Sequence, residues 1–238
     1  MLHRKPFLQA GQDLRDLPTY TLPEAATFLA VPPRTIHYWF AGNSPILEPS
    51  GHLGDISLLS FRDLAEAYTL ELLRTFYGFN LRTLREVLEN FRKETRLKRP
   101  LLEADLYVVL GNLVLRKPAR GTQPLRMVDL AHRRNLVFPD LVNMIGRRVL
   151  IDNKHAPYRI YPWRLASLND ESKPVSIDPE VVSGRLVVTG TRVPVWVLRG
   201  QKIAGKSIQQ IAQSYHLSRE TVEKALLHIE RTIPKKAA

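Results

Sequence analysis

A segment near the N-terminus of the chain is repeated near the C-terminus without a gap, and this repeat restricts the fold most. Residues Thr21–Ile36 (TLPEAATFLAVPPRTI) align with Ser207–Val222 (SIQQIAQSYHLSRETV). Each copy begins with a hydroxyl residue and carries Glu or Gln three positions later, the capping box that opens a helix. A small residue, Ala26 or Ala212, follows where two helices must approach closely. A Thr before a branched apolar residue then opens a second helix, so the repeat predicts two helix-turn-helix units.

The two units differ on the outward face of their second helix, which is the face that enters a DNA major groove. The N-terminal copy offers donors and amphipathic groups suited to base edges and phosphates: Arg34, Thr35, His37 and Tyr38. The C-terminal copy offers Arg219, Glu220, Glu223 and Lys224, and phosphates would repel its two carboxylates. We therefore assign DNA reading to the first copy and protein contact or packing to the second. The alternative for His37 and Tyr38 is partial burial beside Trp39.

The charge distribution indicates where further phosphate contacts come from. The net charge of +12 favours polyanions such as nucleic acid. Residues 1–60 hold four basic and five acidic residues (net −1), residues 61–173 hold 21 and 13 (+8), and residues 174–238 hold ten and five (+5). The N-terminal reader thus needs help from the arginine-rich helix predicted over Leu81–Lys98, where Arg82 and Arg85 are predicted DNA contacts and plain solvation is the alternative. His52, in a hairpin wing predicted at Ser50–Gly54, completes the predicted DNA-binding set.

No pattern of catalytic or metal-binding residues is present. The chain has no cysteine, which excludes disulfides and thiolate ligands. Its seven histidines lack metal-site spacing, and no nucleophile elbow, phosphate loop or dinucleotide fingerprint occurs. Asp63 and Glu66 are interpreted as solvated helix-surface carboxylates. We expect no cofactor or metal and no enzyme activity, with an enzyme as the less favoured class. Without a secretory signal or an apolar run of about 18–20 residues, we expect a cytoplasmic protein with no membrane partner.

The remaining segments predict a mainly α fold with small β-hairpins, an α+β class. Two β-branched runs flank a Gly-Asn turn in Tyr107–Arg116, and Arg148–Asp152 and Tyr158–Tyr161 read as another strand pair. The polar, proline-ended segment 167–174 is interpreted as a linker. We therefore predict three parts: a winged helix-turn-helix domain with its following helices (1–98), a hairpin-rich middle region (99–170) and a C-terminal helix-turn-helix domain (174–238).

The stretch Val187–Trp196 (VVTGTRVPVW) precedes the C-terminal unit and admits two interpretations. It is either an anion-holding loop or a bend that feeds a strand into a helix, and the second is favoured because no phosphate-loop lysine follows. Gly190 supplies the backbone freedom of the turn, and Pro194 presets the helix start. Val195 and Leu198 are expected to pack inward. Geometry explains these residues but not Arg192, which is expected to be exposed.

Two segments resemble known families. Residues 20–98, with YTLPEAATFLAVPPRTIHYWF and FRDLAEAYTLELLRTFYGFNLRTLREVLENFRK, resemble the winged helix-turn-helix of MerR-like regulators. Residues 175–230, with IDPEVVSGRLVVTGTRVPVWVL, Gly205 and SIQQIAQSYHLSRETVEKAL, resemble a small domain of VapB-like antitoxins, in which a short β element precedes a three-helix homeodomain-like bundle. The combination implies a type II antitoxin that silences a PIN-like ribonuclease toxin and represses its own operon.

The resemblance also implies partners, and charge and loop position indicate which residues would contact the toxin. A homodimer would present two reader helices to two half-sites. Toxin contact is assigned to Arg192, Thr191 and Arg199, and Arg192 is hypothesised to enter the carboxylates that hold Mg²⁺ in the nuclease. Unchanged toxin inhibition by Arg192→Ala would contradict that hypothesis. The alternative is a MerR-like transcriptional regulator whose C-terminal part senses a ligand or dimerises, without a toxin partner.

Overall fold

The computed structural model describes residues 12–76, 78–95, 98–103, 106–109, 112–117, 126–129, 147–153, 156–162 and 171–230. Within these ranges the fold is α+β, with helices and small antiparallel sheets, as predicted. The first elements are η1 (Leu14–Asp16), β1 (Tyr20–Thr21), α1 (Leu22–Leu29), α2 (Pro33–Ala41), β2 (Gly51–Leu53), β3 (Ile56–Leu59), α3 (Phe61–Phe76), α4 (Leu81–Thr95) and α5 (Pro100–Glu103). The others are β4 (Leu106–Val109), β5 (Asn112–Lys117), β6 (Arg126–Asp129), β7 (Val149–Ile151), β8 (Pro157–Ile160), β9 (Val175–Ser176), η2 (Val182–Gly184), β10 (Val187–Val188), α7 (Val195–Ile203), α8 (Ile208–Ser214) and α9 (Arg219–Glu230).

The predicted repeat folds into two helix-turn-helix units, α1–α2 and α8–α9, with the same local geometry. Thr21 and Ser207 each form a complete capping box with the residue three positions on. Ala30 and His216 occupy equivalent places in the turn, and both adopt a left-handed backbone with φ of 54°. The residue after each donates its backbone N–H to the carbonyl of the small helix residue, Val31 to Ala26 at 3.0 Å and Leu217 to Ala212 at 2.9 Å. The predicted helix-turn-helix repeat and its capping boxes are confirmed, and the two units also share the conformation of the turn.

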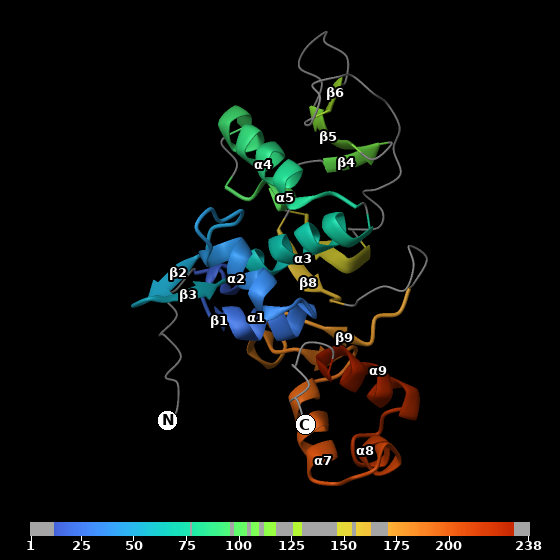
Figure 1. Ribbon diagram of the computed structural model, residues 1–238. Coiled ribbons are helices and arrows are strands. Elements are labelled where there is room, and N and C mark those ends of the chain that lie inside the picture. The colour runs from blue at the N-terminus through green and yellow to red at the C-terminus, as the bar shows by residue number, and fades with distance from the viewer. Residues whose placement is uncertain are drawn as a thin grey trace.

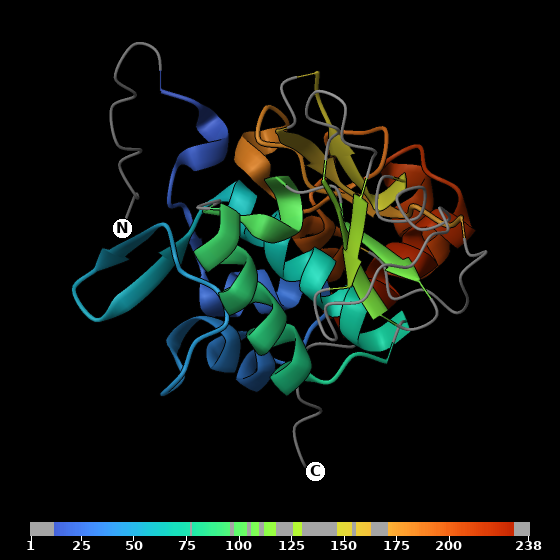
Figure 2. The same cartoon turned by 90° about the horizontal axis from the view of Figure 1, so that it is seen from above.

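The predicted wing is part of a three-stranded antiparallel sheet with strand order β1-β3-β2. His52 of β2 lies opposite Ser57 of β3, and the hairpin turns at Gly54 and Asp55. Both overall views show this hairpin projecting from the helices (Figures 1 and 2). The third strand, β1, pairs with β3 immediately before α1 begins, so the sheet fixes the wing relative to the first helix-turn-helix. The N-terminal part is thus a winged helix-turn-helix.

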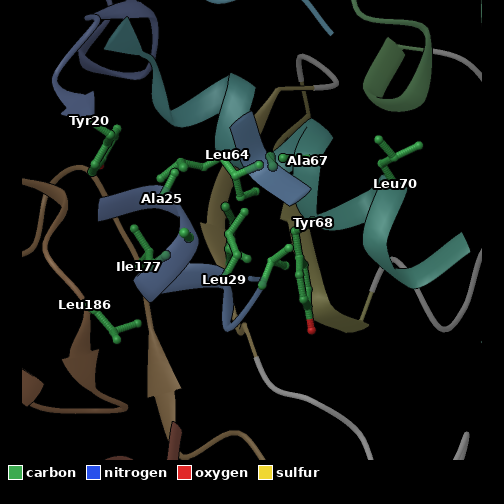
Figure 3. Packing of buried hydrophobic residues seen from close by; sticks show 14 of the residues in the cluster. Tyr20, Ala25, Leu29, Leu64, Ala67, Tyr68, Leu70, Ile177 and Leu186 are labelled. Atoms are coloured by element: carbon green, nitrogen blue, oxygen red, sulfur yellow. The ribbon is translucent and has the colours of Figure 1, made fainter. Parts of the chain in front are cut away.

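One hydrophobic core joins the N-terminal helices to the C-terminal segment. Helix α3 contributes Leu64, Ala67 and Tyr68 to it, and α1 contributes Ala25 and Leu29 (Figure 3). The strands and helices after residue 174 add further fully buried side chains to the same cluster: Val175, Ile177, Val195, Leu198, Val222 and Ala225. Burying a Val, Leu or Ile side chain stabilises a fold by about 1.5–3 kcal/mol, so this shared core holds the two parts together.

Polar contacts fix the position of the C-terminal segment against α1. Tyr20 donates its hydroxyl to the carbonyl of Gly184 at 3.0 Å, and His228 Nε2 donates to the carbonyl of Phe28 at 2.8 Å. Arg185 forms an ion pair with Glu24, the capping-box residue of α1. Burial would raise the pKa of Glu24, but hydrogen bonds from Thr21 and Arg185 outweigh it and lower the pKa. Figure 1 accordingly places α7–α9 beneath α1, at the end of the molecule opposite α4 and β4–β6.

The middle region contains both predicted hairpins, but the predicted two-residue Gly-Asn turn is wrong, because Asn112 already belongs to β5. Strands β4 and β5 pair from Val109 opposite Asn112, and β6 extends them to a three-stranded sheet. Strands β7 and β8 pair with a register shift at Leu150/Ile151. Ile160 of β8 then exchanges two backbone hydrogen bonds of 2.9 Å with Ile177, which links this region to the C-terminal segment. Residues 167–170 of the predicted linker lie outside the described residues. Its remaining residues, 171–174, have no regular secondary structure.

The interpretation of Asp63 and Glu66 as solvated carboxylates is wrong, because their side chains are only 1% and 3% exposed. Asp63 forms a capping arrangement at the start of α3: it accepts the backbone N–H of Ser60 at 2.8 Å and that of Ser50 at 2.9 Å. Arg99 adds an ion pair at 2.9 Å. Glu66 lies one turn further on, beneath α4 and α5. Helix-surface spacing could not reveal this burial, because α3 is covered on more than one side.

Candidate nucleic-acid interface

Helix α2 separates its residues into a buried and an exposed face. Ile36, Trp39 and Phe40 are buried, whereas Arg34, His37 and Tyr38 are exposed and Thr35 is half-buried. His37 is therefore not buried beside Trp39, whereas Tyr38, at 41% exposure, is partly covered. The helix begins at Pro33 after Pro32, which makes no side-chain capping bond. Pro33 has no backbone N–H, and those of Thr35 and Ile36 donate to the carbonyl of Pro32 at 2.9 and 3.2 Å, so the start of the helix leaves at most the N–H of Arg34 for an external acceptor.

Arg85 of α4 joins the exposed face of α2. Its Nη2 donates to the hydroxyl of Tyr38 at 2.9 Å and to the carbonyl of Ser44 at 2.8 Å, and its guanidinium carbon lies 5.6 Å from the centre of the Tyr38 ring. Arg92, two turns later, donates to the carbonyl of Ile46 at 2.9 Å. These bonds position the segment after α2 against α4. The basic face of α4 is thus not only solvated: Arg85 contacts α2, and Arg92 contacts the segment that follows α2.

The other residues predicted to contact DNA are Arg82 and His52, and neither is bonded to Arg85 or Tyr38 in the described ranges. Arg82, one turn before Arg85, is exposed and forms an ion pair with Glu86 at 3.2 Å. His52 is exposed on β2 in the wing. No hydrogen bond or ion pair involves the side chains of Arg34 or His37 within the described ranges, so both are available to a ligand.

A groove of about 410 Å³ lies between α2 and the wing. Arg34 and His37 of α2 line it together with Asp55 and Ile56 of the wing, and Pro23 of α1 also contributes to the lining. Most of the lining is apolar, which suits deoxyribose and base methyl groups rather than free ions. Asp55 is the one carboxylate among the lining residues, and it would disfavour a phosphate at the tip of the wing. The basic end of the groove is therefore the α2 side.

The second helix-turn-helix carries its charges in internal pairs. Arg219 contacts Glu223 at 2.8 Å, and Lys224 contacts Glu220 at 2.7 Å, both across one turn of α9. The hydrogen bond from Lys224 also lowers the pKa of Glu220. Because each cation already has a carboxylate partner, this face has little to offer a phosphate row. The opposite face of α9 packs on α1 through His228.

The predicted partner-binding residues lie at the start of the C-terminal bundle. Gly190 has φ of 77° in the predicted turn, and Pro194 caps α7, whose Val195 and Leu198 are fully buried as predicted. The hydroxyl of Thr191 donates to the carbonyl of Val188 at 2.9 Å and accepts the N–H of Val193 at 3.0 Å, so it holds the turn. Arg192 is exposed and Arg199 half-buried.

Within the part of the chain that the structure describes, no group of three or more acidic or histidine side chains could hold a metal ion. In the same ranges, no helix has both the length and the apolar character that a bilayer crossing requires. The exposed face of α2, the arginines of α4 and the wing together form a candidate binding surface.

Comparisons with known proteins agree with this architecture. Residues 175–228 match the family described as "protein of unknown function (DUF433)". The crystal structure of Rv2018 from Mycobacterium tuberculosis is similar with a TM-score of 0.54 and 21% identity, covering 88% of this chain and 98% of that chain. At that identity the similarity shows the fold alone, an α+β fold over nearly the full length of both chains. No curated protein matches the sequence.

Proposed function

We propose that this chain is a DNA-binding antitoxin that represses its own operon at promoter DNA and neutralises a PIN-like ribonuclease toxin. The observation that carries the DNA part is the free, exposed pair Arg34 and His37 on a helix whose opposite face is buried. A guanidinium can donate two hydrogen bonds to guanine O6 and N7, the commonest specific contact in a major groove. The proposal includes no catalysis, cofactor or membrane, and places the chain with its promoter in the cytoplasm.

The geometry around α2 supports a division of labour on DNA. Arg34 and His37 face base edges, with Thr35 beside them, while Arg85 and Arg82 of α4 supply phosphate contacts. Tyr38 is held by Arg85, so the two present one hydroxyl and one guanidinium to the same strand. His52 extends the surface along the wing. The contact with phosphates therefore comes from α4, which compensates for the acidic balance of residues 1–60.

A homodimer is part of the proposal, because each chain offers one reader helix. The internally paired charges of α9 argue against a second reader in the same chain. A two-fold dimer would place two α2 helices one helical turn of DNA or a multiple apart, and the promoter would then contain an inverted repeat.

The toxin part rests on the resemblance of residues 175–230 to VapB-like antitoxins, with Arg192 and Arg199 at the start of the bundle. These cations, placed by the turn that Thr191 holds, suit an acidic nuclease surface. Co-purification of the nuclease encoded beside this chain's gene tests this part. A regulator without a toxin partner would bind its promoter and yet leave that nuclease uninhibited.

A mobility-shift titration of the chain's own promoter tests the DNA part. Arg34→Ala should weaken binding by about 1–3 kcal/mol, the value of one bidentate base contact. Arg219→Ala is the matched control, because it also removes one exposed arginine from the first turn of a helix-turn-helix second helix. Equal affinities of the two variants would show that α2 does not read DNA.

A further inference from the structure

Helix α7 carries two large apolar side chains that the fold leaves in solvent. Trp196 is 66% exposed and Ile203 is 71% exposed. They are seven positions apart, so they lie on the same face of the helix, two turns from each other. Gly200 lies between them and is also exposed. The opposite face holds the fully buried Val195 and Leu198, which pack into the bundle core.

This apolar face is surrounded by cations without partners. In residues 174–230, Arg185, Lys202, Arg219 and Lys224 each form an ion pair with a carboxylate. The other cations of this segment have no carboxylate within ion-pair distance in the described ranges: Arg192, Arg199 and Lys206. One precedes α7, one lies on it and one follows it. The uncompensated positive charge of the segment is thus concentrated around the Trp196–Ile203 face.

We propose that the α7 face, formed by Trp196, Gly200 and Ile203 and bordered by Arg192, Arg199 and Lys206, docks an acidic protein surface with an apolar cleft. The inference rests on the proposed function and names the occupant as the nuclease encoded beside this chain. Tryptophan and arginine are the residues most enriched among those that dominate protein–protein binding energy. Charge complementarity selects an acidic partner.

Two other occupants fit the face less well. A second copy of this chain would bring its own Arg199 and Lys206 against the same residues, and like charges brought together in an interface are repulsive. A nucleic acid would use the cations but leave the isoleucine at the far end of the face without a partner. The face also belongs to the bundle beneath α1, whereas α4 lies at the other end of the molecule (Figure 1). Docking on α7 and DNA binding by α2 are therefore separable by mutation.

Gly200 provides a variant that tests the surface without disturbing the fold. A Cβ at this position would meet no atom within 4 Å in the free chain, so a larger residue is accommodated. Leucine is also a better helix former than glycine. Gly200→Leu should therefore keep the chain folded while placing a bulky side chain in the middle of the docking surface. Trp196→Ala removes the exposed indole, and Ile151→Ala is the matched control, an exposed apolar residue on β7.

The experiment measures inhibition of the purified neighbouring nuclease on a fluorescent RNA, with promoter binding and thermal unfolding measured for each variant. Trp196→Ala and Gly200→Leu should each raise the half-inhibitory concentration about 30-fold, as expected for a dominant interface residue. Ile151→Ala should inhibit like the wild type, and all three should bind promoter DNA normally.

Wild-type inhibition by both α7 variants would overturn the docking surface while leaving the antitoxin proposal intact. A wild-type chain that does not bind the nuclease would overturn the toxin part and the docking surface together, with promoter binding still deciding the DNA part. Loss of promoter binding by Trp196→Ala would assign the face to nucleic acid, and a change in the sedimentation of free Gly200→Leu would assign it to a second copy. Either result contradicts the proposal.

Discussion

Glu66 gives the sharpest prediction about stability, because its carboxyl group is buried among other charges. Burial raises the pKa of Glu66 from its ordinary 4.5 to about 8, with nearby Asp63 adding to the shift and Arg92 and Arg99 opposing it. Its Oε1 has no hydrogen-bond donor in the described part of the chain. The folded protein therefore keeps a proton on Glu66 at pH values where the unfolded chain has released it.

The sign of the pH effect follows from this difference in bound protons. Between pH 4.5 and about pH 8 the folded state holds one proton more than the unfolded state, so raising the pH favours unfolding. The free energy of unfolding should fall by about 1.4 kcal/mol per pH unit in this window from Glu66 alone, with a ceiling of about 5 kcal/mol. Below pH 4.5 both states are protonated and the contribution is fully present.

Glu66→Gln should remove this pH dependence, because the amide is uncharged and similar in size. Urea unfolding at about pH 5 and about pH 7.5 measures it: the stability of the variant relative to the wild type should increase by about 3 kcal/mol between the two. Glu89→Gln, on the exposed face of α4, is the control: its free energy of unfolding should differ from that of the wild type by the same amount at both pH values. A constant difference between Glu66→Gln and the wild type at both pH values would refute the reasoning.

Two further predictions concern the packing against α1 and the DNA surface. Gly184→Ala should lower the free energy of unfolding by about 2–4 kcal/mol, because φ is 74° and the new Cβ would lie 2.0 Å from the hydroxyl oxygen of Tyr20. The control is Gly190→Ala, where φ is similar but no atom lies within 4 Å of the new Cβ. Equal losses of stability for the two variants in thermal unfolding would contradict the packing argument. Arg85→Ala should reduce the slope of log K against log salt for promoter binding by about 0.9, one phosphate contact; an unchanged slope would mean that Arg85 serves only to hold Tyr38.

The proposed DNA surface and the proposed α7 docking surface belong to parts of the fold that are packed against each other. Glu24 caps α1 and pairs with Arg185 of the C-terminal segment, and Tyr20 and His228 add hydrogen bonds across the same boundary. The bundle that would dock a partner is therefore packed directly against α1 of the helix-turn-helix that would read DNA. A ligand at either surface would therefore bind a protein in which the two units are already held together by these contacts.

The sequence alone determined the local conformations, because their causes lie within a few residues. The capping boxes at Thr21 and Ser207 and the turn at Thr189–Thr191 each depend on hydrogen bonds between near neighbours. The repeat was decisive, since matching residue types at a few key positions gave the same turn, even at the left-handed Ala30 and His216, where the residues differ. The division of α2 into buried and exposed faces likewise follows from its helical period.

The tertiary structure alone decided which distant residues meet. The sequence pattern predicted Arg85 and Tyr38 separately as DNA contacts. It could not predict the hydrogen bond between them, because they lie on different helices that are far apart in the sequence. Asp63 and Glu66 have the spacing of surface carboxylates and became buried because α3 is covered on several sides. Trp196 is a large apolar residue of the kind usually buried in a core. It is exposed because Val195 and Leu198 occupy the buried face of α7 instead. Burial depends on what packs against an element, and that is a property of the whole chain.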